Sequence, residues 1–100
     1  MTAVKVPKKA VKHIMERHGD WVQMLGLKSA AEVQVFLSQV VSQPDETYAD
    51  RFVSGVKYYL KYLQELGGKL LCVVVVGDEV KTAYFINRQR YIKYRARRWT

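Results

Sequence analysis

Apolar residues in the first half of the chain recur at the spacing of an α-helix. The interval from Lys9 to His18 predicts a helix whose apolar stripe is Val11, Ile14, Met15 and His18. Gly19 is a typical residue for the end of such a helix. If the helix resumes after this glycine, the same stripe continues through Trp21, Val22 and Leu25.

A second helix is expected to begin at Ser29, where the sequence Ser-Ala-Ala-Glu forms a capping box. Proline lacks the backbone N–H that a helix interior requires, so Pro44 ends this helix. The apolar face between these two points consists of Val33, Phe36, Leu37, Val40 and Val41.

After Pro44 the apolar residues form short runs that are typical of β-strands. Thr47–Val53 predicts a short strand that ends before Ser54-Gly55. Val56–Leu63 alternates like a strand, but it also offers apolar residues at helical spacing as far as Leu66. Its valine and tyrosines favour the strand, and a sheet of only two later strands would be poorly stable. We therefore predict a strand here, with the helix as the alternative.

The next two runs, Lys69–Val76 and Val80–Ile86, predict a hairpin around Gly77-Asp78. The first has no polar alternation, so it is expected to be a central strand covered on both faces. From Arg88 onward, the pattern fits a helix, a frayed end or a fifth strand equally well. The sequence thus predicts a single α+β domain over residues 1–100, with N-terminal helices packed on a C-terminal antiparallel sheet of about four strands.

The charge of the chain is concentrated at its two ends. The net charge is +8 at pH 7, and residues 1–12 carry four lysines and no acid, whereas residues 13–86 are slightly acidic. Such ends are either solubilising tails or phosphate-binding segments whose affinity falls with salt. The cations of the final segment, free of acids, are Arg88, Arg90, Lys93, Arg95, Arg97 and Arg98.

The longest unbroken apolar run, Leu70–Val76, is far shorter than the roughly 20 residues of a membrane helix, so no membrane contact is expected. This run contains the single cysteine, Cys72, which cannot form an internal disulfide. A buried free cysteine is consistent with a cytoplasmic protein.

The two histidines are the first candidates for chemistry. His13 and His18 are five residues apart, about 140° around a regular helix, so they cannot both face one metal ion from that helix. Since no second Cys or further His completes a zinc site, we expect no metal and no cofactor. His18 is either a core or C-cap residue or a recessed general acid or base. His13 shares the polar face with Lys9 and Arg17 and could simply be solvated.

Two sets of strand residues are further candidates. Lys57, Tyr59 and Lys61 share one face of a strand, where they form either a phosphate cradle or an ordinary solvated surface. Thr82 and Tyr84 also share a face. They are common β-formers, but their hydroxyls could hold a phosphate oxygen and orient a neighbouring base.

The order of these parts carries a family resemblance. A helix with His-Ile-x-x-Arg-His is followed by Gln43-Pro44-Asp45, by Tyr58-Tyr59-Leu60-Lys61, by a valine-rich strand and by Thr82-Ala83-Tyr84. Over roughly residues 13–86, this combination resembles the barnase–EndoU–colicin–RelE superfamily of small ribonucleases. It is most similar to the phage and polymorphic-toxin branches of that superfamily.

The resemblance implies a helical part packed on a four-stranded antiparallel sheet and a toxin-like or phage-encoded endoribonuclease. Such an enzyme cleaves RNA without a metal, by attack of the 2′-hydroxyl on the adjacent phosphate, and leaves a cyclic phosphate. Carried over to this chain, His18 or His13 would be the general base or acid. Lys61, or Lys57 on the same face, would stabilise the charge of the phosphorane.

By the same resemblance, Thr82 would hold a phosphate oxygen and Tyr84 would position the base or the leaving group. Arg88 and Arg90 would grip the flanking backbone, together with the other cations of the C-terminal segment. The implied partners are RNA, including tRNA, and a cognate inhibitor protein.

Two other function classes fit the same sequence. A non-catalytic nucleic-acid-binding module would use the basic ends and exposed tyrosines for phosphate contact and stacking. A small adaptor or inhibitor would direct its basic ends at an acidic protein. A binding module has no reason to bring His18 and Thr82 together, so their separation in the fold discriminates between catalysis and binding.

Overall fold

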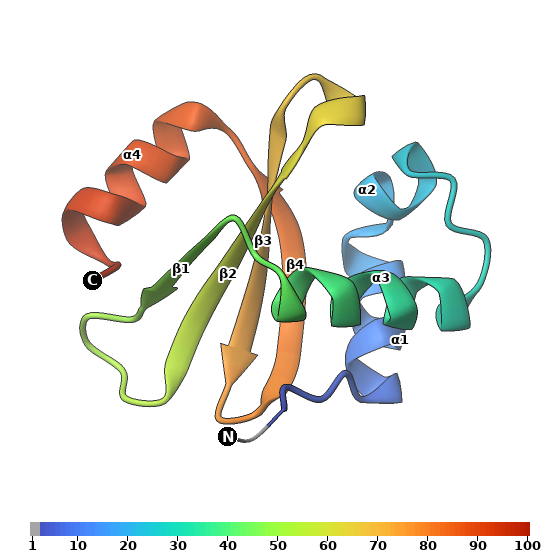
Figure 1. The fold of residues 1–100 in the computed structure, drawn as a ribbon, viewed down its shortest axis with the longest axis horizontal. Helices are drawn as coiled ribbons and strands as arrows, with labels where there is room; N and C mark the ends of the chain where they lie inside the picture. Colours follow the sequence, from blue (N-terminus) through green and yellow to red (C-terminus); the bar gives the residue numbers. More distant parts are fainter. Residues whose placement is uncertain (1–2) are drawn as a thin grey trace.

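The computed structural model describes residues 3–100 and has the predicted α+β architecture, with helices first and an antiparallel sheet after them (Figure 1). The helices are α1 (Lys8–Arg17), α2 (Gly19–Met24), α3 (Ala30–Ser42) and α4 (Arg88–Arg97), with one 3-10 turn at Gln64–Leu66. The strands are β1 (Glu46–Ala49), β2 (Val56–Leu63), β3 (Lys69–Val76) and β4 (Glu79–Ile86).

The starts of the N-terminal helices follow local sequence signals. The side chain of Ser29 accepts a hydrogen bond from the backbone N–H of Glu32 at 3.2 Å, which caps α3 as the capping box predicts. Helix α1 ends one residue earlier than expected. His18 has φ −132° and ψ 38°, outside the helical region, and α2 begins at Gly19. The chain therefore changes direction at His18.

The sheet has the order β1-β2-β3-β4, with every neighbouring pair antiparallel. Val56–Leu63 is the strand β2, so the helical alternative for this segment is excluded. The predicted strand Thr47–Val53 is too long, because β1 ends at Ala49. There the carboxylate of Asp50 accepts hydrogen bonds from the backbone N–H groups of Phe52 and Val53, which turns the chain away from the sheet.

Strand β3 is covered on both faces, as its uninterrupted apolar sequence predicts. Helices α1, α2 and α3 lie on one side of the sheet and α4 on the other (Figure 1). The indole Nε1 of Trp21 donates to the carbonyl of Ala83 at 3.0 Å and so fixes α2 to β4. The sheet residues in the first core layer are Leu63, Leu71, Val73, Val75, Val80 and Ala83. Those in the second layer are Tyr58, Leu60, Leu70, Cys72 and Ile86.

The basic C-terminal segment is neither frayed nor a fifth strand: it forms α4 and then returns to the sheet. The side chain of Asn87 caps α4 by accepting from the backbone N–H of Arg90 at 2.8 Å. After the helix, the backbone N–H and carbonyl of Thr100 pair with Ala49 at the edge of β1. Trp99 is 2% exposed and belongs to the second core layer. The cations of this segment are therefore held on a folded surface.

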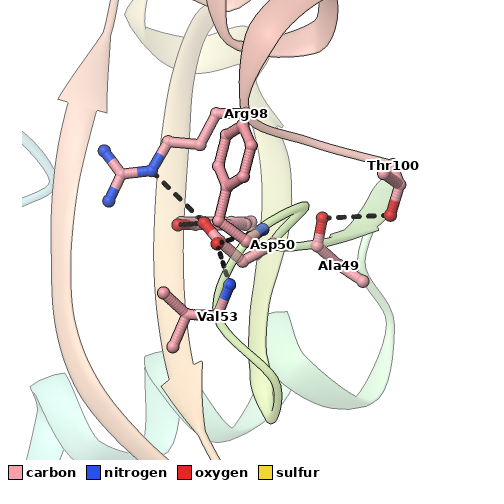
Figure 2. A network of polar contacts seen from close by, with 7 residues as sticks. Ala49, Asp50, Val53, Arg98 and Thr100 are labelled. Atoms are coloured by element: carbon pink, nitrogen blue, oxygen red, sulfur yellow. Dashed lines mark hydrogen bonds and ion pairs between the residues drawn. The ribbon is translucent and has the colours of Figure 1, made fainter.

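Asp50 connects this C-terminal segment to the turn after β1. One carboxylate oxygen accepts from the hydroxyl of Tyr58 at 2.6 Å and from Nε of Arg98 at 3.3 Å. The other accepts from the N–H groups of Phe52 and Val53, and Figure 2 shows Val53 and Arg98 converging on the same carboxylate. These donors, led by the Tyr58 hydroxyl, lower the pKa of Asp50 to about 2.

We expect Asp50→Asn to lower the free energy of unfolding at pH 7 by about 1.5–3 kcal/mol, because a charged acceptor with several donors is lost. The folded-state pKa is lowered, so this contribution is present above pH 3.8 and is lost as the pH falls toward 2. Urea unfolding at pH 7 and at pH 3 measures both effects. Asp78→Asn is the matched control, since its ion pair with Lys5 is exposed. Equal effects of the two substitutions at pH 7 would contradict the prediction.

Candidate active site

The two histidine rings lie together at the end of α1. Their centroids are 5.9 Å apart in an edge-to-face arrangement. In a regular helix they would point about 140° apart, but α1 ends at Arg17 and His18 has left the helical geometry. The two rings therefore meet, although a regular helix through both residues would hold them far apart.

Tyr84 of β4 joins the histidines. Its ring centroid is 5.8 Å from that of His18. Tyr84 pairs with Cys72 and so projects from the sheet face that carries Trp99, whereas α1 lies on the other side. Because β4 is an edge strand, His18 meets Tyr84 around the free edge of the sheet. The contact is a tertiary one that no local pattern in the sequence indicates.

A pocket of about 570 Å³ opens between α1 and the β3–β4 hairpin, and both His13 and Thr82 line it. Lys9 and Lys81 also line the pocket, as does the carboxylate-bearing Glu79. Lys81 is the extra residue of a bulge, because Thr82 pairs with Val74 while Val80 pairs with Val75. The sequence analysis did not single out Lys9 or Lys81 for this site, and no glycine or other signal marks the bulge.

The hydroxyl of Thr82 is the unusual polar group of this region. Its Oγ1 is buried and has no hydrogen-bond partner among residues 3–100. A buried hydroxyl without a partner costs roughly 1–3 kcal/mol, so nearly all such groups in proteins are paired. This hydroxyl is closed to solvent and projects from the face of the sheet that carries α4.

The electrostatics assign different protonation states to the members of this cluster. Burial lowers the pKa of His18 below 6.5, and His13 and Arg17 lower it further against the opposing effect of Asp20. His18 is therefore mainly neutral at pH 7 and can accept a proton. Burial raises the pKa of Tyr84 well above its usual range, so this hydroxyl remains a donor. Burial also raises the pKa of Cys72 to about 12, which rules out a thiolate nucleophile at neutral pH.

The coupling between the histidines gives a test that needs no substrate. We expect His13→Gln to raise the pKa of His18, because a positive charge 5.9 Å away no longer opposes protonation. Asp20→Asn should lower it. A pH titration of the His18 Cε1–H resonance by NMR measures both shifts, with Lys12→Gln as a control on the exposed side of α1. An unchanged His18 pKa in His13→Gln would contradict the pairing of the two rings.

Three sequence candidates are not brought to this cluster. Lys57, Tyr59 and Lys61 pair with Val75, Val73 and Leu71, so they project from the sheet face under the N-terminal helices. Lys61 is instead 3.6 Å from the carboxylate of Asp45 and 3.4 Å from the carbonyl of Gln43. Thr82 and Tyr84 project from the opposite face. Strand alternation therefore separates Lys61 from the hydroxyls with which the family resemblance groups it.

The cations of the C-terminal segment fall into different environments. Arg98 pairs with Asp50, and the guanidinium of Arg95 lies 5.7 Å from the ring centroids of Tyr48 and Tyr91. Both of these cations thus also contribute to packing. The remaining four are exposed to solvent: Arg88, Arg90, Lys93 and Arg97.

Glu46 is a polar centre that the sequence analysis missed. Its carboxylate accepts hydrogen bonds from the hydroxyls of Tyr48, Tyr62 and Tyr91, the last two at 2.5 Å. Although burial opposes it, these hydrogen bonds lower the pKa of Glu46. The only sequence signal is the unusual number of tyrosines, since the three rings come from β1, β2 and α4.

Comparisons with known proteins do not assign a family to this chain. No protein-family model matches it, no curated protein matches its sequence, and no solved structure matches its fold. Among residues 3–100, no helix combines the length and the apolar composition that crossing a bilayer requires. Within the same residues, His, Cys, Asp and Glu side chains do not gather in threes as metal ligands.

Proposed function

We propose that this protein is a metal-independent endoribonuclease of the toxin-like or phage-encoded kind. The observation that carries the proposal is the convergence of His13, His18 and Tyr84 beside the pocket that His13 shares with Thr82. A module that only binds nucleic acid does not require the histidine rings to meet. The pocket brings Thr82 together with His13, and His18 is not among the residues that line it. The family resemblance in the sequence supports the same reaction.

In the proposed reaction, neutral His18 accepts the proton of the ribose 2′-hydroxyl as that oxygen attacks the adjacent phosphorus. The bond from phosphorus to the 5′-oxygen breaks, and protonated His13 donates a proton to the leaving oxygen. The products are a 2′,3′-cyclic phosphate and a 5′-hydroxyl. Rings with centroids 5.9 Å apart can both reach the oxygens of one phosphodiester.

Other groups of the site would stabilise the charge that develops on the phosphorane. The Tyr84 hydroxyl remains protonated and can donate to a phosphate oxygen. The Thr82 hydroxyl lacks a partner among the described residues but is buried, so it would give a second hydrogen bond only after a local movement of β4. Lys9 and Lys81 line the pocket that contains His13. In the proposed reaction they would stabilise the phosphorane charge, the role that the resemblance gives to Lys61.

The test is incubation of the purified protein with RNA in EDTA, followed by mass spectrometry of the product ends. We expect fragments that end in cyclic phosphate. The matched control is an oligonucleotide with a 2′-deoxyribose at the cleaved position, which should remain intact because it lacks the nucleophile. Cleavage of the deoxy substrate would contradict the mechanism. Intact RNA that still binds with a steep salt dependence would favour the binding module, for which the exposed cations of α4 are the supporting observation.

RNA, including tRNA, is the proposed substrate, and a cognate inhibitor protein is the proposed second partner. The basic surface suits an acidic inhibitor as well as it suits RNA. If RNA is neither cleaved nor bound, such an acidic protein becomes the leading candidate for the partner of this chain.

A further inference from the structure

A second pocket lies between α4 and the turn that joins β2 to β3. Its volume is about 670 Å³, larger than that of the pocket at the histidines. It is lined by two tyrosines, Tyr62 and Tyr91, and by two cations, Arg88 and Arg95. Lys69 also lines it, but the Lys69 ammonium lies 5.3 Å from the ring centroid of Phe85, on the face of the sheet under the N-terminal helices. Aromatic rings beside cations are the combination that binds single-stranded nucleic acid, since rings stack on bases and cations contact phosphates.

The tyrosines of this pocket are held in place before any ligand binds. The hydroxyls of Tyr62 and Tyr91 both donate to Glu46, and Arg95 lies over the ring of Tyr91. The negative charge of Glu46 is therefore stabilised by the hydroxyl donors and by the nearby positive charge of Arg95. Because the rings are fixed, a base that stacks on them does not have to immobilise them, which favours binding.

The second pocket is linked to the histidines through Tyr84, which lies on the same face of the sheet as the pocket and meets His18 around the edge of β4. Leu70 and Ile86 pair with each other and line the pocket. The next pair on the same face is Cys72 and Tyr84, and Tyr84 contacts His18. Successive residues on one face of a strand are about 7 Å apart. An extended RNA strand held at the histidines can therefore place a neighbouring nucleotide in the second pocket.

We propose that this pocket is a subsite for a nucleotide that flanks the cleaved phosphodiester. Tyr62 and Tyr91 would stack on its base, and Arg88 would contact its phosphate. Stacking and phosphate contact do not read the identity of a base, so the subsite would select for the length of single-stranded RNA. This inference rests on the proposed function, because it defines the subsite relative to the cleaved bond.

The test compares cleavage of a ribodinucleotide, which reaches only the histidine site, with cleavage of an RNA hexamer. In the wild-type protein, kcat/KM should be higher for the hexamer. Tyr62→Leu should lower kcat/KM for the hexamer roughly tenfold or more and leave the dinucleotide unchanged. Tyr62→Phe keeps the ring and should retain most of the length preference. A length preference that survives Tyr62→Leu would overturn the subsite.

A second arm tests the phosphate contact of Arg88 and separates the subsite from catalysis. Arg88→Gln should weaken binding of a 2′-O-methyl RNA hexamer, which cannot be cleaved, and reduce the salt dependence of its binding. Lys28→Gln, on the surface before α3, is the matched loss of one charge and should have little effect. If RNA is not cleaved but Tyr62→Leu and Arg88→Gln weaken this binding, the catalytic proposal fails and the nucleotide pocket stands. If RNA is cleaved but Tyr62→Leu and Arg88→Gln change neither binding nor length preference, the pocket is not a subsite.

Discussion

His18→Ala is expected to lower the rate of RNA cleavage by about 10²- to 10⁴-fold, the usual contribution of a general acid or base. Affinity for RNA should hardly change, because the exposed cations of α4 are untouched. The ring of His18 lies beside both His13 and Tyr84, and its lowered pKa keeps it in the proton-accepting form. Cleavage is measured in EDTA, and affinity is measured with 2′-O-methyl RNA.

Two further measurements separate a chemical role of His18 from a structural one. In the wild-type protein, kcat/KM should fall on the acid side through a pKa below 6.5, since protonated His18 cannot act as the base. Added imidazole should partly restore cleavage by His18→Ala, because it can occupy the space that the substitution leaves. Full activity of His18→Ala, or an equal loss of binding and cleavage, would remove His18 from the catalytic role.

Trp99→Ala is expected to lower the free energy of unfolding by about 3–5 kcal/mol, the range for loss of a large buried aromatic side chain. Trp99 stacks on Tyr48 with centroids 5.0 Å apart and also contacts Tyr58 and Tyr94. These rings come from β1, β2 and α4, so one side chain connects the C-terminal helix to the sheet. The loss is a large part of the 5–15 kcal/mol typical of a small domain.

Urea unfolding measures this effect, with the fluorescence of the buried Trp21 as the probe. Phe52→Ala is the matched control, because Phe52 is 77% exposed and its loss should cost little. Trp99→Phe keeps an aromatic ring in the cluster and should lie between the two. If Trp99→Ala destabilises no more than Phe52→Ala, the aromatic cluster does not hold α4 on the sheet.

The substitution Trp99→Ala should also impair RNA binding in the proposed subsite. Helix α4 provides Arg88, Tyr91 and Arg95 to the second pocket. If α4 detaches from the sheet, these residues lose their positions opposite Tyr62. The preference for long RNA should therefore decline in Trp99→Ala, whereas the histidine pair at the end of α1 stays in place.

The hydrophobic periodicity of the chain, together with its capping and breaking residues, determined the class of the fold and most of its elements. Three of these signals are local: the apolar stripe from Val11 to Met15, the cap at Ser29 and the break at Pro44. Each depends only on neighbouring residues, so the sequence pattern is sufficient to predict the element. The same holds for the β3–β4 hairpin. The uninterrupted apolar run of β3 predicted its burial on both faces, because each face of a strand needs apolar residues only where it is covered.

Only the tertiary structure decided the parts that depend on distant partners. Val56–Leu63 carries both helical and strand periodicity, and pairing with β1 and β3 selects the strand. The basic C-terminal segment becomes an ordered helix because Trp99 finds an aromatic site formed by residues about forty to fifty positions earlier, around Tyr48 and Tyr58.

The candidate site, too, was predicted from the sequence only in part, and the rest was decided by the tertiary structure. The sequence pointed to the histidines, to Thr82 and to Tyr84 through their chemistry and order, but it grouped Lys61 with them. The alternation of side chains along β2 places Lys61 on the sheet face under the N-terminal helices. The break in helical geometry at His18 brings the two histidine rings together. The contact of His18 with Tyr84 passes around the edge of β4, where two elements distant in sequence meet. A side chain's type is local information, but the partner it faces depends on register, helix ends and packing, which only the folded chain fixes.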